Sequence, residues 1–84
     1  MRYRDTDTDR FPEYVWLSKN VTKLRLERGF SQAELATKMG SGTVQAYVSA
    51  LERMQVNPTL EVLSRLAAAL ETTISDLFRE PADS

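Results

Sequence analysis

The 84-residue sequence contains no cysteine and no histidine. These absences exclude disulfides, cysteine nucleophiles, zinc bound by cysteine or histidine, and acid–base catalysis by imidazole. Catalysis would have to rest on carboxylates and lysines, and the chain shows no nucleophile–base pair, metal-binding cluster or phosphate-binding glycine loop. We therefore predict that the protein is not an enzyme and that it needs no metal or cofactor.

Long apolar runs are missing as well. No run approaches the roughly 20 residues that a membrane span requires, and the first residues do not resemble a secretory signal peptide. We expect a cytoplasmic protein that does not insert into a membrane. The length allows one domain with one modest core, and it leaves no room for a deep substrate cleft.

Apolar residues recur at helical spacing along most of the chain. Val15, Leu17, Val21 and Leu24 predict a first helix that starts after Pro12, and Gly29 is placed to end it. Ser31-Gln-Ala-Glu34 is a capping box that opens a second helix, and Gly40-Ser-Gly42 stops that helix. The inner face of the second helix is expected to carry Leu35, Ala36 and Met39.

The second half of the chain continues this pattern. We expect a third helix over residues 43–54, a fourth capped by Thr59, and a short fifth opened by a capping box at Thr73-Ile-Ser-Asp76. No segment shows the alternation of a β-strand, so the fold class is all-α. The residues expected to point inward are Val44, Val48 and Leu51, then Leu60, Leu63, Leu66, Ala67 and Leu70, then Leu77 and Phe78.

Charge is distributed unevenly along the chain. The net charge is −1 and the sequence pI is about 5.4, but residues 14–70 carry seven Lys and Arg against four Glu. Residues 1–12 alternate charge with threonine, which predicts a flexible arm over residues 1–13. The alternative is an arm that clasps a dimer or follows a DNA groove, but its acids argue against contact with phosphate. We expect a domain over residues 14–79 and a tail over residues 80–84.

The second and third helices and the glycine turn between them have the form of a helix-turn-helix unit. Such a unit uses its second helix to enter the major groove of DNA, so that helix needs small or polar side chains on its outer face. Glutamine can pair with adenine, serine can bond to several base edges, and alanine can touch a thymine methyl group. The outer face here carries Gln45, Ala46, Ser49, Ala50 and Arg53.

The same region resembles a known family over residues 20–78. Arg25-Leu-Glu-Arg-Gly-Phe-Ser-Gln-Ala-Glu-Leu-Ala36 is similar to the first half of the Cro/CI-type (Xre) helix-turn-helix domain. Gln45-Ala-Tyr-Val-Ser-Ala-Leu-Glu-Arg53 and Asn57-Pro-Thr-Leu-Glu-Val-Leu63 are similar to its second half, and Ile74-Ser-Asp-Leu-Phe78 to its end. The resemblance implies a five-helix, lambda-repressor-like domain that regulates transcription by binding a two-fold operator in double-stranded DNA as a homodimer.

The resemblance also implies roles for single residues. Gln32 matches a glutamine that contacts a phosphate and braces a glutamine of the recognition helix, and Gln45 occupies that partner position. Tyr47 matches a position that points toward phosphates. The residues matching positions that face DNA are Thr43, Gln45, Ala46, Ser49 and Ala50, with Arg53 and Gln55 at the edge toward the backbone.

Two features depart from the family pattern. The turn after the second helix is two residues longer than usual, so either it bulges while both helices keep their places or the third helix is reset. Met54 stands where glycine is common, and it must avoid the left-handed conformation or accept its cost.

Other roles stay open at this point. Trp16 is a candidate for packing or for a dimer interface, and Leu77 and Phe78 either close the core or form part of that interface. Arg53 can bind DNA or pair with Glu52 or Glu61, while Glu52 is expected to be structural. The alternative function is an antitoxin or another protein-interaction module on the same fold, with a partner such as a toxin.

Overall fold

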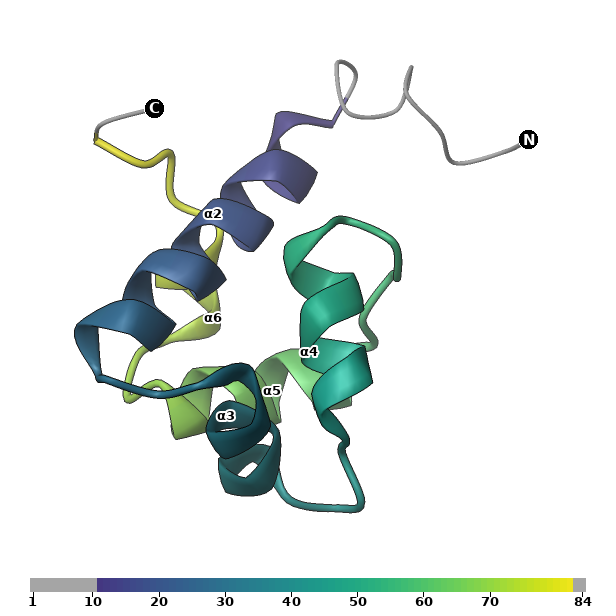
Figure 1. Cartoon of the computed structure of the whole chain (residues 1–84). Coiled ribbons are helices and arrows are strands. Elements are labelled where there is room, and N and C mark those ends of the chain that lie inside the picture. Colours follow the sequence, from purple (N-terminus) through teal and green to yellow (C-terminus); the bar gives the residue numbers. More distant parts are fainter. Residues whose placement is uncertain (1–10, 83–84) are drawn as a thin grey trace.

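The computed structural model describes residues 11–82, which fold into five α-helices with short connections and contain no strand (Figure 1). The all-α prediction is confirmed. The N-terminal arm lies outside the described residues up to position 10, and so does the end of the tail, residues 83–84. The helices are α2 (Pro12–Glu27), α3 (Gln32–Met39), α4 (Gln45–Glu52), α5 (Leu60–Ala69) and α6 (Ile74–Leu77).

The starts of the helices follow from local sequence. Helix α2 begins at Pro12, whose fixed φ suits a first turn, so the helix starts two residues before the expected domain boundary. The capping box at the start of α3 is complete, because the Ser31 hydroxyl accepts from the Glu34 amide and Glu34 Oε1 accepts from the Ser31 amide. Thr59 caps α5 as predicted, through its hydroxyl and the Val62 amide.

The capping box predicted for α6 is only half formed. The Thr73 hydroxyl accepts from the Asp76 amide at 3.0 Å. The Asp76 carboxylate does not return to the backbone of Thr73, because it accepts from Arg79 at 2.6 Å and from the Thr72 hydroxyl at 3.4 Å. The acid therefore strengthens the end of the short helix through a side-chain pair.

Three of the helices end in the same way. Beyond the C-cap of α2, α4 and α5, one amide bonds back to the third carbonyl before it and the next amide to the fifth, which is the Schellman arrangement. The residue at the turning point has a positive φ in each case: Gly29 at 76°, Met54 at 60° and Glu71 at 57°. Met54 thus accepts the left-handed conformation.

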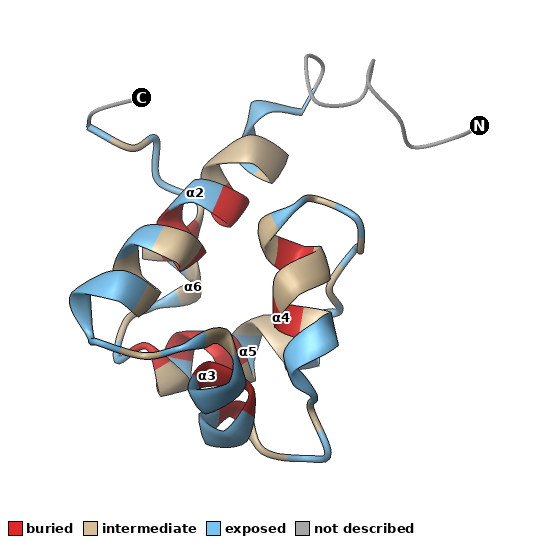
Figure 2. Cartoon of the chain, viewed as in Figure 1, coloured by how far each residue is buried: buried red, intermediate tan, exposed pale blue. Residues whose placement is uncertain are grey.

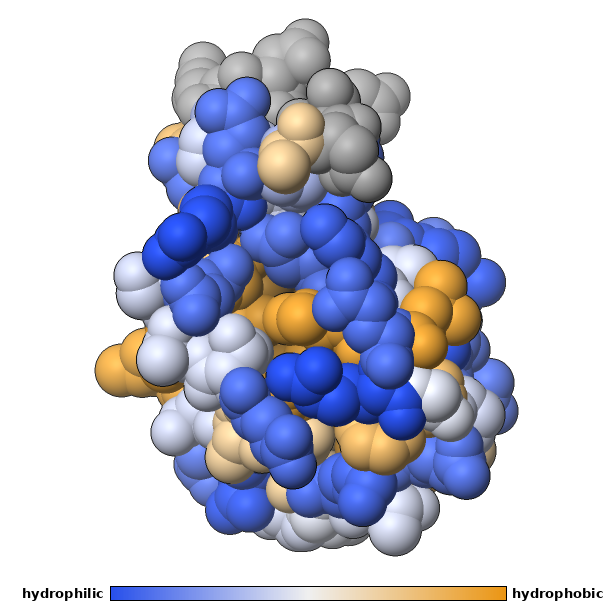
Figure 3. All heavy atoms as spheres, turned by 90° about the vertical axis from the view of Figure 1, so that its left-hand side faces the viewer, coloured by the Kyte–Doolittle hydropathy of each residue, from blue (hydrophilic) through white to orange (hydrophobic). Residues whose placement is uncertain are grey.

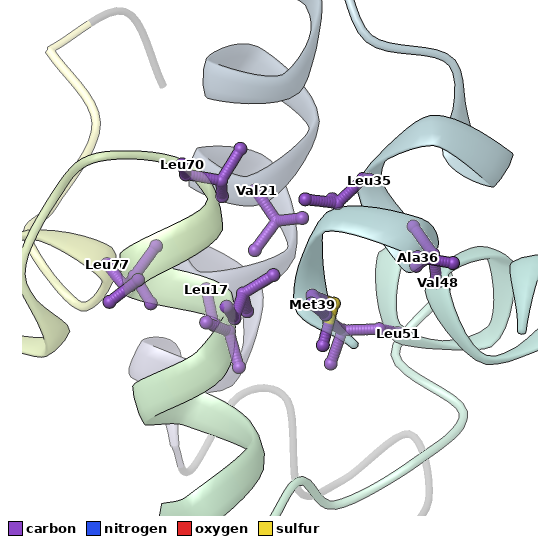
Figure 4. Packing of buried hydrophobic residues seen from close by; sticks show 11 residues of the cluster. Leu17, Val21, Leu35, Ala36, Met39, Val48, Leu51, Leu70 and Leu77 are labelled. Carbon is purple, nitrogen blue, oxygen red and sulfur yellow. The ribbon is translucent and has the colours of Figure 1, made fainter. Parts of the chain in front are cut away.

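The core lies where the five helices meet. Each of α2, α3, α4, α5 and α6 has buried positions (Figure 2), and the labelled core side chains point toward one another (Figure 4). The inward prediction is confirmed for all three residues of α3 and for Val48 and Leu51 of α4. Leu24, Leu63 and Phe78 are partly buried against this core. Its buried members are Leu17, Val21, Leu35, Ala36, Met39, Val48, Leu51, Leu66, Ala67, Leu70 and Leu77.

Two residues predicted to be in the core are exposed. Val44 is the N-cap of α4, which is shorter than predicted, and its extended backbone takes it out of the helical period. Leu60 is the first residue of α5, where the side chain precedes the packed turns of the helix. The exposed fractions are 60% for Val44 and 72% for Leu60.

A buried amide fastens the last helix to the first. Asn20 is 9% exposed on α2, and its Nδ2 donates to the carbonyl oxygens of Leu77 and Arg79 at 2.8 Å each. These carbonyls lie at the end of α6, where the helix itself provides no donors. Asn20 therefore supplies the polar contact that holds a four-residue helix in place.

Candidate nucleic-acid interface

The connection between α3 and α4 runs over residues 40–44 and contains a tight turn. The Thr43 amide donates to the Gly40 carbonyl at 3.1 Å, and the two residues between them, Ser41 and Gly42, have φ values of 57° and 75°. Positive φ at both central positions corresponds to a type I′ turn. Gly40 itself has φ 72° and ψ −166°, a region that side chains exclude.

The longer connection leaves the two helices in register with each other. Gln45 Nε2 on α4 donates to Gln32 Oε1 on α3 at 3.1 Å, which is the pairing that the resemblance implies. The longer turn therefore does not reset the helix that follows it. The extra residues bulge, and the first residues of both helices stay within hydrogen-bond distance.

The glutamine pair continues into the interior of the domain. Gln32 Nε2 donates to Glu52 Oε1 at 3.0 Å, and Glu52 accepts from Arg25 at 2.6 Å and 3.2 Å. Arg25 also donates to the Phe30 carbonyl at 2.9 Å. The side chains of Arg25 and Glu52 are only 12% and 8% exposed. Glu52 is therefore structural, as expected, and it joins α4 to α2 and α3.

The predicted DNA-facing residues lie along one run from the turn through α4. Gln45 and Ala46 are exposed, and Thr43, Tyr47, Ser49 and Ala50 are partly exposed. The Thr43 hydroxyl donates to the Gly40 carbonyl at 2.7 Å, so it stabilises the turn and keeps its lone pairs as acceptors. Burial raises the pKa of the Tyr47 hydroxyl further above neutral pH, and this hydroxyl, like that of any tyrosine, can donate at pH 7.

Arg53 stands at the end of α4 without an acidic partner among the described residues. Its Nη2 donates to Gln55 Oε1 at 3.3 Å. The two candidate acids are engaged elsewhere, Glu52 with Arg25 and Glu61 with Arg65. The charge of Arg53 is therefore available to an anion outside the domain.

A helix-turn-helix family model matches residues 21–77 of the chain. The chain belongs to the Xre (Cro/CI-type) helix-turn-helix family. It is 32% identical over 65 residues to the HTH-type transcriptional regulator SinR of Bacillus subtilis and to that of Bacillus licheniformis. These matches cover 76% of the chain and 57% of each regulator, so the chain spans little more than half the length of these relatives.

The fold comparison agrees with this assignment. The crystal structure of a hypothetical transcription factor from Neisseria superimposes with a TM-score of 0.76 at 34% identity, over 83% of this chain and 78% of that one. These similar proteins are described as a transcriptional regulator and a transcription factor, which supports a role other than catalysis. Within residues 11–82, no group of acids could hold a metal ion, and no helix is long and apolar enough to cross a membrane.

The three residues considered for an interface between two copies of the domain differ in how far they are exposed at its surface. Leu77 has an exposed fraction of 0% and belongs to the core, so the role of a dimer contact is corrected to that of closing the core. Trp16 and Phe78 are partly exposed. Phe78 lines a hollow of about 340 Å³ with Phe11, Tyr14, Leu17, Asn57, Pro58 and Leu63. Phe78 therefore lies in a hollow lined mainly by apolar side chains.

The neighbouring face of the domain is mostly hydrophilic. Seen from the side of α2 and α6, hydrophilic side chains cover most of the surface, and apolar atoms show in a central hollow and in separate spots near the edges (Figure 3). A hollow between these helices is lined by Asn20, Lys23, Leu24, Glu27, Thr72, Asp76, Arg79, Glu80, Pro81 and Ala82. Most residues of this lining are polar or charged, so this face is a weaker candidate for self-association than the hollow at Phe78.

The sequence did not predict two features of the structure, the exposure of Val44 and the contacts of Asn20. Val44 is exposed at the tip of α4 beside Gln45, and the signal for it was the extra length of the turn, which makes residue 44 a cap. The sequence pattern assigned no role to Asn20, whose buried amide bonds to the end of α6. No short-range pattern marks an amide that pairs with carbonyls more than 50 residues away.

Proposed function

We propose that this protein regulates transcription in the cytoplasm by binding a two-fold operator as a homodimer, most simply as a repressor. Helix α4 enters the major groove, where Gln45, Ala46, Ser49 and Ala50 face the bases. Gln32, Tyr47 and Arg53 contact the phosphates on either side, with Thr43 and Gln55 at the edges of the contact. Trp16 and Phe78 contribute to the contact between the two copies.

The observation that supports this proposal most is the hydrogen bond between Gln45 and Gln32. It holds a polar side chain on the exposed side of α4 in one orientation, and a preorganised amide loses little conformational entropy when it meets a base. Within residues 11–82 Arg53 has no acidic partner, which adds a positive charge at the end of the same helix.

Selection of bound oligonucleotides tests the proposal directly. We expect the protein to recover a sequence with two-fold symmetry from a random pool, because two copies of α4 reach two half-sites about one helical turn apart. Recovery of no preferred sequence at low salt would remove the proposed function. Co-purification of a protein partner in that case would support the antitoxin alternative.

Substitutions on α4 then assign the face that reads the bases. Gln45→Ala and Ser49→Ala should each weaken binding to the selected operator by about 1–3 kcal/mol per lost base contact and leave the fold intact. Ser64→Ala on the exposed side of α5 is the matched control and should bind like the wild type. Equal binding by all four proteins would show that another surface reads the operator.

A further inference from the structure

We propose that Glu52 is a positioning residue that determines which DNA base Gln45 recognises. The inference rests on the proposed function and concerns the direction of hydrogen bonding along the path from Glu52 through Gln32 to Gln45. In this path Gln32 donates to Glu52 at 3.0 Å and accepts from Gln45 at 3.1 Å.

The carboxylate gives the path its direction. A glutamine amide has a donor end and an acceptor end of nearly the same shape, so an isolated amide can turn over. An ionised carboxylate only accepts. Gln32 must therefore direct its NH₂ group to Glu52 and its oxygen to Gln45. Gln45 must then donate from its own NH₂ group to that oxygen.

The carboxylate is itself held in place. Arg25 donates to both of its oxygens, at 2.6 Å and 3.2 Å, and is fixed by a further bond to the Phe30 carbonyl. Both charged side chains are largely buried. The guanidinium balances the charge of the carboxylate, so the acid does not face the phosphates as a free anion.

This arrangement leaves Gln45 with a defined set of free groups. One N–H of its amide is used by Gln32, so the second N–H and the oxygen remain for a base. Adenine offers an acceptor at N7 and a donor at N6, which match this pair. Guanine offers two acceptors, N7 and O6, and one of them would oppose the glutamine oxygen. The geometry therefore assigns adenine to the position read by Gln45.

Glu52→Gln tests the direction of the path. The single oxygen left at this position is required by Arg25 Nε, the shortest of the contacts, so the new NH₂ group turns toward Gln32. Both glutamines then reverse, and Gln45 presents its NH₂ group to the base. We expect the preference for adenine over guanine at that operator position to fall about tenfold or more.

A double variant should restore the preference. With Glu52→Gln and Gln32→Glu together, a carboxylate stands in the middle of the path and accepts from both sides, which returns Gln45 to its original direction. Total affinity should fall because a negative charge now lies near phosphate, but the ratio of affinities for the adenine and guanine operators should recover. A purely structural role for Glu52 would not produce this recovery.

The ratio is measured by competition between two operators that differ at one base pair, at one salt concentration, with circular dichroism to establish folding. Glu61→Gln on the exposed side of α5 is the matched control and should keep the wild-type ratio. If Glu52→Gln does not fold, the ratio of affinities is measured for Gln32→Ala instead. This variant leaves the Arg25–Glu52 pair intact but removes the partner of Gln45, so the adenine preference should again fall.

The outcomes separate the two proposals. Failure of the wild-type protein to select any operator removes the proposed function. An unchanged ratio in folded Glu52→Gln, or in Gln32→Ala, overturns the role of Glu52 while the function stands. The same follows if Gln45→Ala shows that Gln45 reads a base other than adenine.

Discussion

At the scale of single residues, backbone conformation at the helix ends is a determinant of stability. Gly29, Met54 and Glu71 occupy equivalent positions in three Schellman ends, and all three have φ between 57° and 76°. Side chains other than that of glycine raise the energy of this conformation by about 1–2 kcal/mol. The family pattern has glycine where this chain has Met54, so the chain carries a removable cost there.

Met54→Gly should raise the free energy of unfolding by about 0.5–1 kcal/mol, because the gain in the folded state exceeds the extra entropy of glycine in the unfolded state. The corresponding rise in melting temperature is about 2–8 °C for a domain of this size. Glu71→Gly, at the same position after α5, is the matched comparison and should act in the same direction. Thermal unfolding followed by circular dichroism checks both, and a lower melting temperature for Met54→Gly would mean that packing of the methionine outweighs its backbone strain.

At the scale of helices, the sequence predicted interiors better than ends. Residues in the middle of α3, α4 and α5, such as Leu35, Val48 and Leu66, are buried as their spacing indicates. Apolar residues three or four positions apart lie on the same face of a helix. The prediction that Val44 and Leu60 point inward is wrong because both lie at helix starts, where the helical period does not yet apply. Boundaries depend on turn geometry that the periodicity does not contain.

The candidate site shows the same division. The residue types on α4 and the glutamine pair could be predicted from the motif, and Gln45 does meet Gln32. The continuation from Gln32 to Glu52 and Arg25 joins three helices, and such a contact depends on how the helices pack. Sequence spacing alone carries no information about that packing.

The attachment of α6 provides a test at this scale. Asn20→Ala removes the donor that meets the carbonyl oxygens of Leu77 and Arg79, so two acceptors at a helix end lose their partner. We expect the free energy of unfolding to fall by about 1–3 kcal/mol. Amide hydrogen exchange should quicken most in α6, because a helix of four residues is not stable without such contacts.

Ser75→Ala on the exposed side of α6 serves as the control, and it should leave both stability and exchange close to those of the wild type. If Asn20→Ala melts at the wild-type temperature, the buried amide does not hold α6 and the core alone positions it.

At the scale of the whole molecule, size and charge constrain how the domain can bind DNA. The principal extents are 32 × 28 × 19 Å, and one copy carries one helix-turn-helix unit. Successive major grooves on one side of DNA lie about 34 Å apart. A single copy can therefore occupy one groove, and a two-fold site requires a second copy. The net charge of −1 means that attraction to phosphate must come from local cations.

Arg53→Ala should reveal that local contribution. Each phosphate contact that is lost lowers the slope of log affinity against log salt by about 0.9, so the dimer should lose about 1.8 in slope if each copy makes one such contact. The loss of affinity should be similar for all operator sequences, because phosphates carry no base information. Affinity titrations at several salt concentrations measure the slope.

Arg65→Ala is the matched control, since Arg65 is paired with Glu61 at 3.0 Å and its removal should leave the slope unchanged. An Arg53→Ala variant with the wild-type slope would place Arg53 away from the DNA.

The lone tryptophan of the chain gives the molecule an intrinsic optical reporter. Trp16 is partly buried on α2, so its emission responds to changes around the first helix. Dilution of the protein without DNA should shift this emission if copies meet near Trp16, and no label needs to be attached. The same indole offers a spectroscopic view of unfolding.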